Sequence, residues 1–275
     1  MIVERQRLTI TLKPSVIQFV DQQIDGTNVR NRSHAIETLI QRQMKPKLEK
    51  ALVLAAGVGA AMQPFTLETP KPLLKVHGQT ILDHILKNLG ELELTGLTLV
   101  ISHLGEQIVS HIESTETSLD IDYLECPPTG TAEPIRKYLT LHPDGPVLLY
   151  YGDVLAEIDL ANFYQYHLER QTLATIAVTS VADPSAYGSL SLKGDLVTAI
   201  NEKPQSDLGT SRLVYAGLAI LEPEVIELMP ESAKSFEIDI LPELVKKQQL
   251  AGYLFEGKWF DIGDASVYAR ALKEW

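Results

Sequence analysis

The pattern of apolar and polar residues divides the chain at about residue 47, after which short apolar runs alternate with helical patterns. Before that point, residues 7–12 read RLTITL and alternate strictly. Such alternation predicts a strand whose second face is formed by Arg7, Thr9 and Thr11, opposite the apolar side chains. A charged connector with one proline, QMKPKLEK at 43–50, separates the two parts, so we expect domains at 1–47 and 48–275.

Residues 1–47, called the head below, also contain two predicted helices. Residues 15–24 place apolar side chains along one side, and Gly26 ends the helix. Ser33 is the predicted N-cap of a second helix that runs to about residue 43. One strand and two helices in roughly 44 residues cannot close a core alone, so the strand requires a partner.

Residues 48–275, called the body below, have the pattern of an α/β domain. Its apolar runs are short and rich in β-branched residues, as in strands that are buried on both faces. Strands that alternate with helices predict a Rossmann-like, mostly parallel sheet flanked by helices. The predicted strands are 51–55, 97–102, 119–124, 146–151 and 253–255, and the predicted helices are 80–89, 237–247 and 264–273.

Composition and charge refine this picture. No apolar run approaches a membrane span, the amino terminus lacks a signal-peptide core, and Cys126 is the single cysteine, which together predict a cytoplasmic protein. Residues 1–47 carry eight Lys/Arg against four Asp/Glu, or +4, and the remainder carries 16 against 32, or −16, giving the net −12. A basic head on an acidic body suggests a separate module that faces a polyanion.

A glycine loop and a lysine follow the first strand of the body. Gly57 and Gly59 lack side chains, so backbone N–H groups can come close to a ligand, and prolines on both sides fix the position of Lys71. This combination predicts a phosphate-bearing ligand at the carboxyl end of the strand. A P-loop is excluded because no Gly-Lys-Ser/Thr follows, and a dinucleotide fingerprint is excluded because Pro64 stops the required helix.

The whole stretch 52–78, LVLAAGVGAAMQPFTLETPKPLLKVHG, closely resembles the first motif of the sugar-1-phosphate nucleotidyltransferases, roughly LAAGxGTRMxPLTxxxPKPLLxVxGxPxL. It departs at Ala60 and Ala61, where that family has threonine and then a catalytic arginine. The resemblance implies a GT-A-like nucleotidyltransferase fold in which Lys71 neutralises the α-phosphate. It also implies that the nucleotide is bound by Leu54, Ala56, Gly57 and Gly59.

Later motifs follow in the family's order. The turn PPTGTA at 127–132 resembles the family's nucleobase turn and implies that Gly130 and Thr131 bind the nucleotide. Asp153, just after a strand, and Asp261, in the segment KWFDIG, resemble the family's Mg²⁺ ligands and catalytic carboxylates. Mg²⁺ as cofactor suits hard carboxylate oxygens.

Three further segments resemble those that line the family's sugar pocket. The resemblance implies that Glu202, in VTAINEKP, holds sugar hydroxyls and that Lys203 holds the sugar phosphate. The other residues implied in sugar-phosphate binding are Tyr187, Gly188 and Gly217.

Two functions therefore remain open. The first is a nucleotidyltransferase that joins a nucleoside triphosphate to a sugar 1-phosphate, impaired by the alanine at position 61. The second is a catalytically inactive sensor of a nucleotide or nucleotide sugar, which acts through the head on DNA binding or assembly. The loss of the arginine and the fused head favour the sensor, whereas the retained lysines and carboxylates favour the enzyme.

The head resembles a ribbon-helix-helix domain, in which two chains pair their strands as an antiparallel ribbon. The resemblance implies a homodimer or a higher even oligomer. It also implies that Arg7, Thr9 and Thr11 enter the DNA major groove, while the start of the second helix meets phosphate. A dimerisation module without DNA binding is the alternative, because only Arg7 is a strong base reader.

Overall fold

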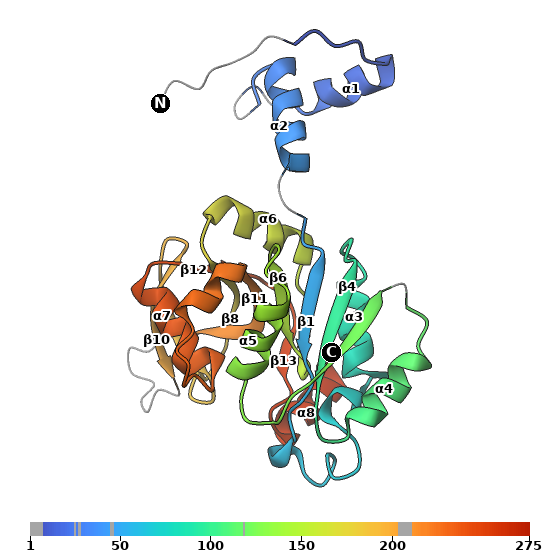
Figure 1. Cartoon of the computed structure of the whole chain (residues 1–275), viewed down its shortest axis with the longest axis vertical. Helices are drawn as coiled ribbons and strands as arrows, with labels where there is room; N and C mark the ends of the chain where they lie inside the picture. Colours follow the sequence, from blue (N-terminus) through green and yellow to red (C-terminus); the bar gives the residue numbers. More distant parts are fainter. Residues whose placement is uncertain (1–7, 25, 27–28, 45–46, 118, 203–210) are drawn as a thin grey trace. The chain divides into compact units, whose positions relative to one another are not determined.

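The computed structural model describes residues 8–24, 26, 29–44, 47–117, 119–202 and 211–275. The chain divides into two compact units, Met1–Pro46 and Lys47–Trp275, drawn in Figure 1 and described separately below. Among the described residues, no helix combines the length and the apolar character that crossing a membrane requires.

The first unit contains helices α1 (Pro14–Gln22) and α2 (Arg32–Met44). Their contact buries Val20 and Ala35, and the guanidinium of Arg32 donates to both carboxylate oxygens of Asp21 at 2.6 and 2.8 Å. The predicted cap at Ser33 is wrong, because Asn31 is the residue whose side chain accepts the His34 N–H, at 3.0 Å. Both residue types cap well, and the helix begins two residues earlier than the sequence indicated.

The segment before α1 is largely exposed. Residues 8–13 belong to no helix or strand, and the side chains of Leu8 and Ile10 are 80% and 46% exposed. The predicted strand requires a second copy for its hydrogen bonds, so that pairing stays a prediction. Thr9 and Thr11 are exposed, whereas Arg7 lies outside the described residues.

The second unit is built on a nine-stranded sheet in the order β5-β4-β1-β6-β11-β8-β12-β10-β9. The strands β5, β4, β1 and β6 are mutually parallel, and β12 is parallel to β8, whereas β11, β10 and β9 run antiparallel to their neighbours. The α/β fold is confirmed, and its parallel part is chiefly the first half of the sheet. The strands are β1 (Lys50–Leu54), β4 (Gly96–Ile101), β5 (Asp120–Glu125), β6 (Val147–Tyr151), β8 (Ala174–Ser180), β9 (Gly188–Lys193), β10 (Leu196–Glu202), β11 (Leu213–Leu221) and β12 (Leu250–Leu254).

Two short antiparallel ribbons supplement the sheet: β2 (Lys75–Val76) with β3 (Gln79–Thr80), and β7 (Val154–Ala156) with β13 (Trp259–Asp261). The second ribbon matters for the site, because it brings the segment after β6 beside the segment around Asp261.

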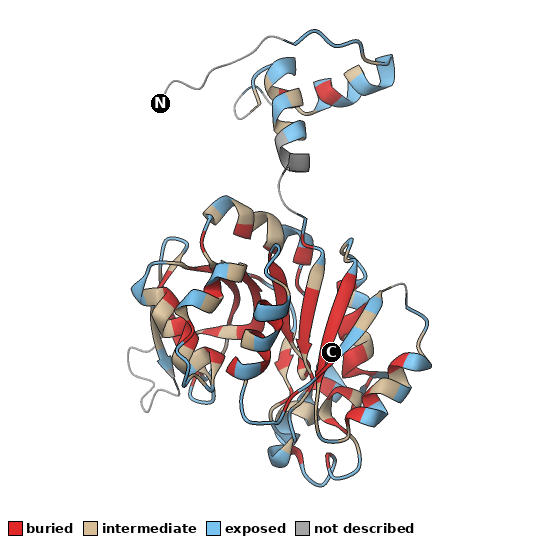
Figure 2. Ribbon diagram, in the orientation of Figure 1, coloured by how far each residue is buried: buried red, intermediate tan, exposed pale blue. Residues whose placement is uncertain are grey.

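Side chains of β1 alternate between two apolar cores, one on each face of the sheet. Ala51 and Val53 enter one core with residues from α3 (Ile81–Leu89), α4 (Gly105–Glu113), α6 (Leu160–Arg170) and α8 (Ala265–Glu274). Leu52 enters the other with residues from α5 (Ala132–Leu141) and α7 (Leu241–Lys246). Figure 2 shows the strands largely buried and the outer faces of the helices exposed. Burial on both faces is the arrangement expected for parallel strands.

The helix expected at 237–247 is two helices of different kinds. A π-helix, Phe236–Ile240, precedes α7, and the Leu241 N–H donates to the carbonyl of Phe236. Pro242 has no N–H, and its ring crowds the carbonyl four residues earlier, so the ordinary α-helical bond cannot form there. The wider π turn follows, and it fixes where the side chain of Glu237 points.

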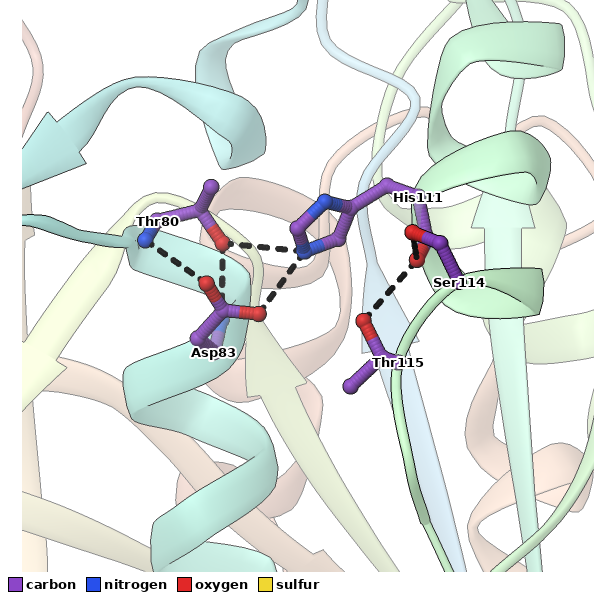
Figure 3. Close-up of polar contacts among 5 residues, drawn as sticks. All are labelled: Thr80, Asp83, His111, Ser114 and Thr115. Carbon is purple, nitrogen blue, oxygen red and sulfur yellow. Dashed lines mark hydrogen bonds and ion pairs between the residues drawn. The ribbon is translucent and has the colours of Figure 1, made fainter.

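A polar contact joins α3 to α4 (Figure 3). Thr80 and Asp83 form a reciprocal capping box at the start of α3, and Asp83 Oδ1 also lies 2.7 Å from His111 Nε2 on α4. The hydroxyls of Ser114 and Thr115 both donate to the backbone carbonyl of His111, at 2.7 and 2.8 Å, and not to its ring. The cluster therefore closes two helix ends and is not a nucleophilic triad.

Candidate active site

The loop after β1 is shaped by Gly59. Its φ is +63°, its carbonyl accepts the Thr66 hydroxyl at 2.6 Å, and a Cβ added to it would lie 2.8 Å from Thr66 Cγ2. A side chain is therefore excluded at Gly59 by the fold itself. At Gly57 an added Cβ meets no atom within 4 Å, so the space beside this backbone is open.

A first cavity, of about 380 Å³, lies at the carboxyl ends of β1 and β6. Most of the residues expected to bind the nucleotide line it, together with Lys71 and Asp153. Gly59 is not among them, so its place is in the loop's own turn. The expected residues that line the cavity are Leu54, Ala56, Gly57, Gly130 and Thr131.

The turn at Gly130 is packed against the segment that leads into the π-helix. Gly130 has φ +139°, and a Cβ there would lie 2.1 Å from the backbone oxygen of Lys234. That oxygen accepts the Ala132 N–H at 3.0 Å, and the Phe236 N–H donates to the Thr131 hydroxyl at 2.8 Å. The side of the first cavity is thus held by residues about a hundred positions away in the sequence.

A second cavity, of about 150 Å³, lies next to the first, and the side chain of Tyr151 borders both. It is lined by Tyr187, Gly188, Gly217 and Asp261, as well as by Glu237. The predicted sugar-binding residues are therefore brought together here, as far as the structure describes them. Glu202 ends β10 directly opposite Gly188, but its side chain lies outside the described residues, as does Lys203.

Lys71 and Asp153 meet where the two cavities adjoin. Lys71 Nζ donates to Asp153 Oδ2 at 2.8 Å, and the two side chains are 13% and 29% exposed. The backbone carbonyl of Asp153 accepts the Ile262 N–H at 2.9 Å, which holds Asp261 beside it. Burial and then the charge of Asp153 raise the pKa of Asp261 well above its usual value, and Lys71 lowers it only in part.

The donor set fits Mg²⁺, which takes hard oxygen ligands and is commonly bound by one or two carboxylates plus substrate phosphates. Asp153, which lines the first cavity, and Asp261, which lines the second, supply two such carboxylates side by side. Across the part of the chain that the structure describes, no group of three or more His, Cys, Asp or Glu side chains gathers as a metal cage. Any metal here would depend on substrate oxygens for the rest of its coordination.

Residues 50–275 match the family model described as nucleotidyl transferase. The chain belongs to the nucleotidyl transferase family. It is 30% identical over 229 residues to mannose-1-phosphate guanylyltransferase catalytic subunit beta of Drosophila melanogaster, with 81% of this chain and 62% of that protein aligned. It is 29% identical over 222 residues to mannose-1-phosphate guanyltransferase of Saccharomyces cerevisiae, with 78% and 61% aligned.

The chain thus spans about three fifths of the length of these curated relatives. The crystal structure of HddC from Yersinia pseudotuberculosis shares the fold, with a TM-score of 0.70 at 24% identity, and the match covers 82% of this chain and 99% of that one. The nucleotidyltransferase fold expected from the sequence is confirmed by this match and by the family model.

One of the two residues at which this chain departs from the family's motif, Ala60, lines a third cavity. Ala60 and Ala61 are exposed in the short 3-10 helix Ala60–Met62, and Ala60 lines a space of about 360 Å³ together with Gln63 and His103. No lysine or arginine is among the described residues that line this space. Nothing in the sequence pattern indicated it, because His103 is brought there by the turn after β4.

Two further residues of the site were not identified from the sequence. Tyr151 is the last residue of a correctly predicted strand, so its position before Gly152-Asp153 was an available signal. Glu237 had no local signal, because its neighbours in space come from other parts of the chain.

Proposed function

We propose that this chain transfers a nucleoside monophosphate from a nucleoside triphosphate to a sugar 1-phosphate and releases pyrophosphate. The observation that supports this most is the pair of adjoining cavities with Lys71, Asp153 and Asp261 at their junction. The names of the relatives make mannose 1-phosphate and GTP the first substrates to test.

In this proposal the triphosphate occupies the first cavity and the sugar occupies the second. An oxygen of the sugar phosphate attacks the α-phosphorus, the bond from that phosphorus to the bridging oxygen breaks, and pyrophosphate leaves with the electron pair. Such transfers depend mainly on positioning and on neutralising charge. Lys71 would neutralise the α-phosphate, and Lys203 would seat the incoming phosphate.

Asp153 and Asp261 would hold Mg²⁺, the cofactor that their oxygen donors fit. When bound, such an ion neutralises phosphate charge and orients the phosphate groups. Lys71 Nζ donates to Asp153, so a phosphate oxygen that contacts the lysine would compete with this carboxylate.

The alternative is a nucleotide or nucleotide-sugar sensor. It is favoured by Ala60 and Ala61, because removing one preorganised donor from a developing oxyanion costs roughly 10²–10³ in rate and removing a transition-state arginine costs roughly 10³–10⁵. Binding does not require that arginine, so an inactive pocket would still respond to its ligand.

One experiment separates the two functions. Pyrophosphate release is measured with Mg²⁺ across GTP, UTP, dTTP, ATP and CTP, each with mannose 1-phosphate and glucose 1-phosphate, for the wild type and for Ala61→Arg. Turnover by the wild type supports the enzyme. Silence of the wild type together with tight nucleotide binding by calorimetry would reject the enzyme and support the sensor, and turnover gained by Ala61→Arg would show that the rest of the site is intact.

For the head we propose a ribbon-helix-helix module that pairs two copies of the chain. The support is the exposed apolar surface of this small unit, where Leu8, Phe19 and Ile40 are 80%, 52% and 51% exposed. Pairing two copies would cover such surface. We further propose that the paired strands present Arg7, Thr9 and Thr11 to DNA.

Both parts of this proposal are tested on the full chain. Light scattering after gel filtration gives the mass, and a monomer at micromolar concentration would reject the pairing. A gel shift on genomic DNA fragments at low salt, with and without nucleotide, tests the DNA contact. Absence of any shift would leave a dimerisation module.

A further inference from the structure

Glu237 occupies the boundary between the two cavities. Its carboxylate lines the second cavity, and it accepts hydrogen bonds from three hydroxyl groups. The Tyr151 hydroxyl donates to Oε1, while Thr131 and Ser235 donate to Oε2 at 3.2 and 2.7 Å. Three separate segments therefore hold this one side chain in place.

The π-helix explains why the carboxylate reaches this position. Ser235 caps the π-helix by accepting the Ile238 N–H, and its hydroxyl hydrogen is given to Glu237. A π turn in an otherwise ordinary helix is uncommon and is frequently found at functional sites. Here it places a charged residue in a wall that otherwise presents mainly aromatic and aliphatic side chains.

The hydrogen bonds of Glu237 are incomplete. An ionised carboxylate offers about four acceptor positions, and three are filled by Tyr151, Thr131 and Ser235. Within the described residues, no lysine, arginine or histidine lies close enough to Glu237 to form an ion pair.

We propose that Glu237 accepts a hydrogen bond from a ring hydroxyl of the sugar in the second cavity, an inference that rests on the proposed function. A neutral hydroxyl group can donate to the acceptor position of Glu237 that Tyr151, Thr131 and Ser235 leave unfilled. A phosphate would be repelled by this carboxylate, and the phosphate groups belong at the junction beside Lys71. The rings of Tyr151, Tyr187 and Tyr215 supply apolar surface for the sugar ring.

Glu237 also ties the sugar pocket to the nucleotide turn. Glu237 Oε2 accepts a hydrogen bond from the Ser235 hydroxyl and another from the hydroxyl of Thr131, a residue that lines the first cavity. The sugar and the nucleotide turn thus share one side chain, and Glu237 is a positioning residue for the turn as well as a ligand contact.

The test is titration calorimetry on the full chain with Mg²⁺, using three pairs of probes: GDP and GDP-mannose, UDP and UDP-glucose, and dTDP and dTDP-glucose. The difference in affinity within a pair reports the sugar alone. The variants are Glu237→Gln, which keeps the size but loses the charge, and Glu231→Gln as a control on an exposed glutamate that lines neither cavity. Thermal unfolding is recorded for each variant.

We expect the wild type to bind at least one nucleotide sugar more tightly than its diphosphate. A hydrogen bond to a charged group is stronger than one to a neutral group. Glu237→Gln should therefore lower the affinity for the nucleotide sugar about 10- to 100-fold, while the affinity for the diphosphate changes by less than about threefold. Glu231→Gln should change neither affinity.

Three results would overturn the inference, and they are distinguishable. If Glu237→Gln weakens diphosphate and nucleotide sugar equally and unfolds at lower temperature, the residue has a structural role only. If the wild type binds each diphosphate as tightly as its sugar ester, the sugar makes no contact in the second cavity. If the wild type binds no member of any pair, the proposed function fails and this inference fails with it.

Discussion

Replacing Asp153 by asparagine should strengthen nucleotide binding when no divalent metal is present. Lys71 is held by Asp153, with Nζ 2.8 Å from Oδ2. A triphosphate that enters the first cavity must therefore compete with this carboxylate for the lysine. It also meets the negative charge of the carboxylate itself. Asp153→Asn removes the charge while keeping an oxygen that can accept from Lys71.

The size of the effect follows from the geometry. Two unit charges 2.8 Å apart attract by roughly 6 kcal/mol at an effective dielectric constant of about 20. Desolvation offsets most of this attraction, and both side chains retain contact with solvent. The net stabilisation from the ion pair is therefore about 1–2 kcal/mol. Since 1.4 kcal/mol is a factor of ten, the variant should bind GTP about 5- to 30-fold more tightly in EDTA.

When Mg²⁺ is present, the wild type should bind GTP more tightly than Asp153→Asn. The wild type offers two carboxylates to the metal and the variant offers one, so the wild type should gain more affinity for GTP on addition of Mg²⁺. Calorimetry in EDTA and in Mg²⁺ measures both affinities. Asp120→Asn, at the exposed start of β5, makes the same change in net charge away from the site. Weaker or unchanged binding of GTP by Asp153→Asn in EDTA would refute the competition between carboxylate and phosphate.

Three further predictions concern stability and assembly. Gly130→Ala should lose about 2–4 kcal/mol of unfolding free energy in urea, because its methyl group would lie 2.1 Å from a backbone oxygen, whereas Gly57→Ala, with open space around the methyl group, should stay within about 1 kcal/mol of the wild type. Asp83→Ala should cost about 1–3 kcal/mol near neutral pH by uncapping α3. Burial raises the pKa of Asp83, but the hydrogen bonds from His111 and Thr80 lower it on balance, so the difference between wild type and Asp83→Ala should shrink as acid protonates the native carboxyl below about pH 4, and a difference that persists there would contradict this. Phe19→Asp, on an exposed position of α1, should convert the expected dimer to a monomer in light scattering, and an unchanged mass would argue against pairing through this surface.

The parts of the site that the sequence predicted are those whose signal is local. The run that becomes β1, the glycines after it and the lysine between two prolines each restrict the backbone through their own residue types. Parallel strands then bring their carboxyl ends to one edge, and this is why Asp153 could be expected near the loop around Gly57. The geometry places both beside the first cavity.

The parts that were missed depend on tertiary contacts or on competition between similar signals. The side chain of Asn31, and not that of Ser33, caps α2. Asparagine and serine both cap helices well, so the residue types alone do not show which of the two is the cap. The π-helix required the effect of Pro242 on the carbonyl four residues earlier to be recognised. Glu237 acquires its role from Thr131 and Tyr151, which lie 106 and 86 positions away, and no window along the sequence contains them together.

The departure at Ala61 separates two properties that usually change together. The residues that would hold a triphosphate before reaction line the first cavity, and neither Ala60 nor Ala61 is among the residues that line it. Groups that act only on the leaving pyrophosphate influence turnover, whereas groups that meet the bound triphosphate influence affinity. Because Ala61 is exposed and belongs to no core, an arginine there needs no rearrangement of the fold. Ala61→Arg should therefore raise turnover far more than it raises nucleotide affinity, and an equal rise in both would mean that this position contacts the triphosphate before it reacts.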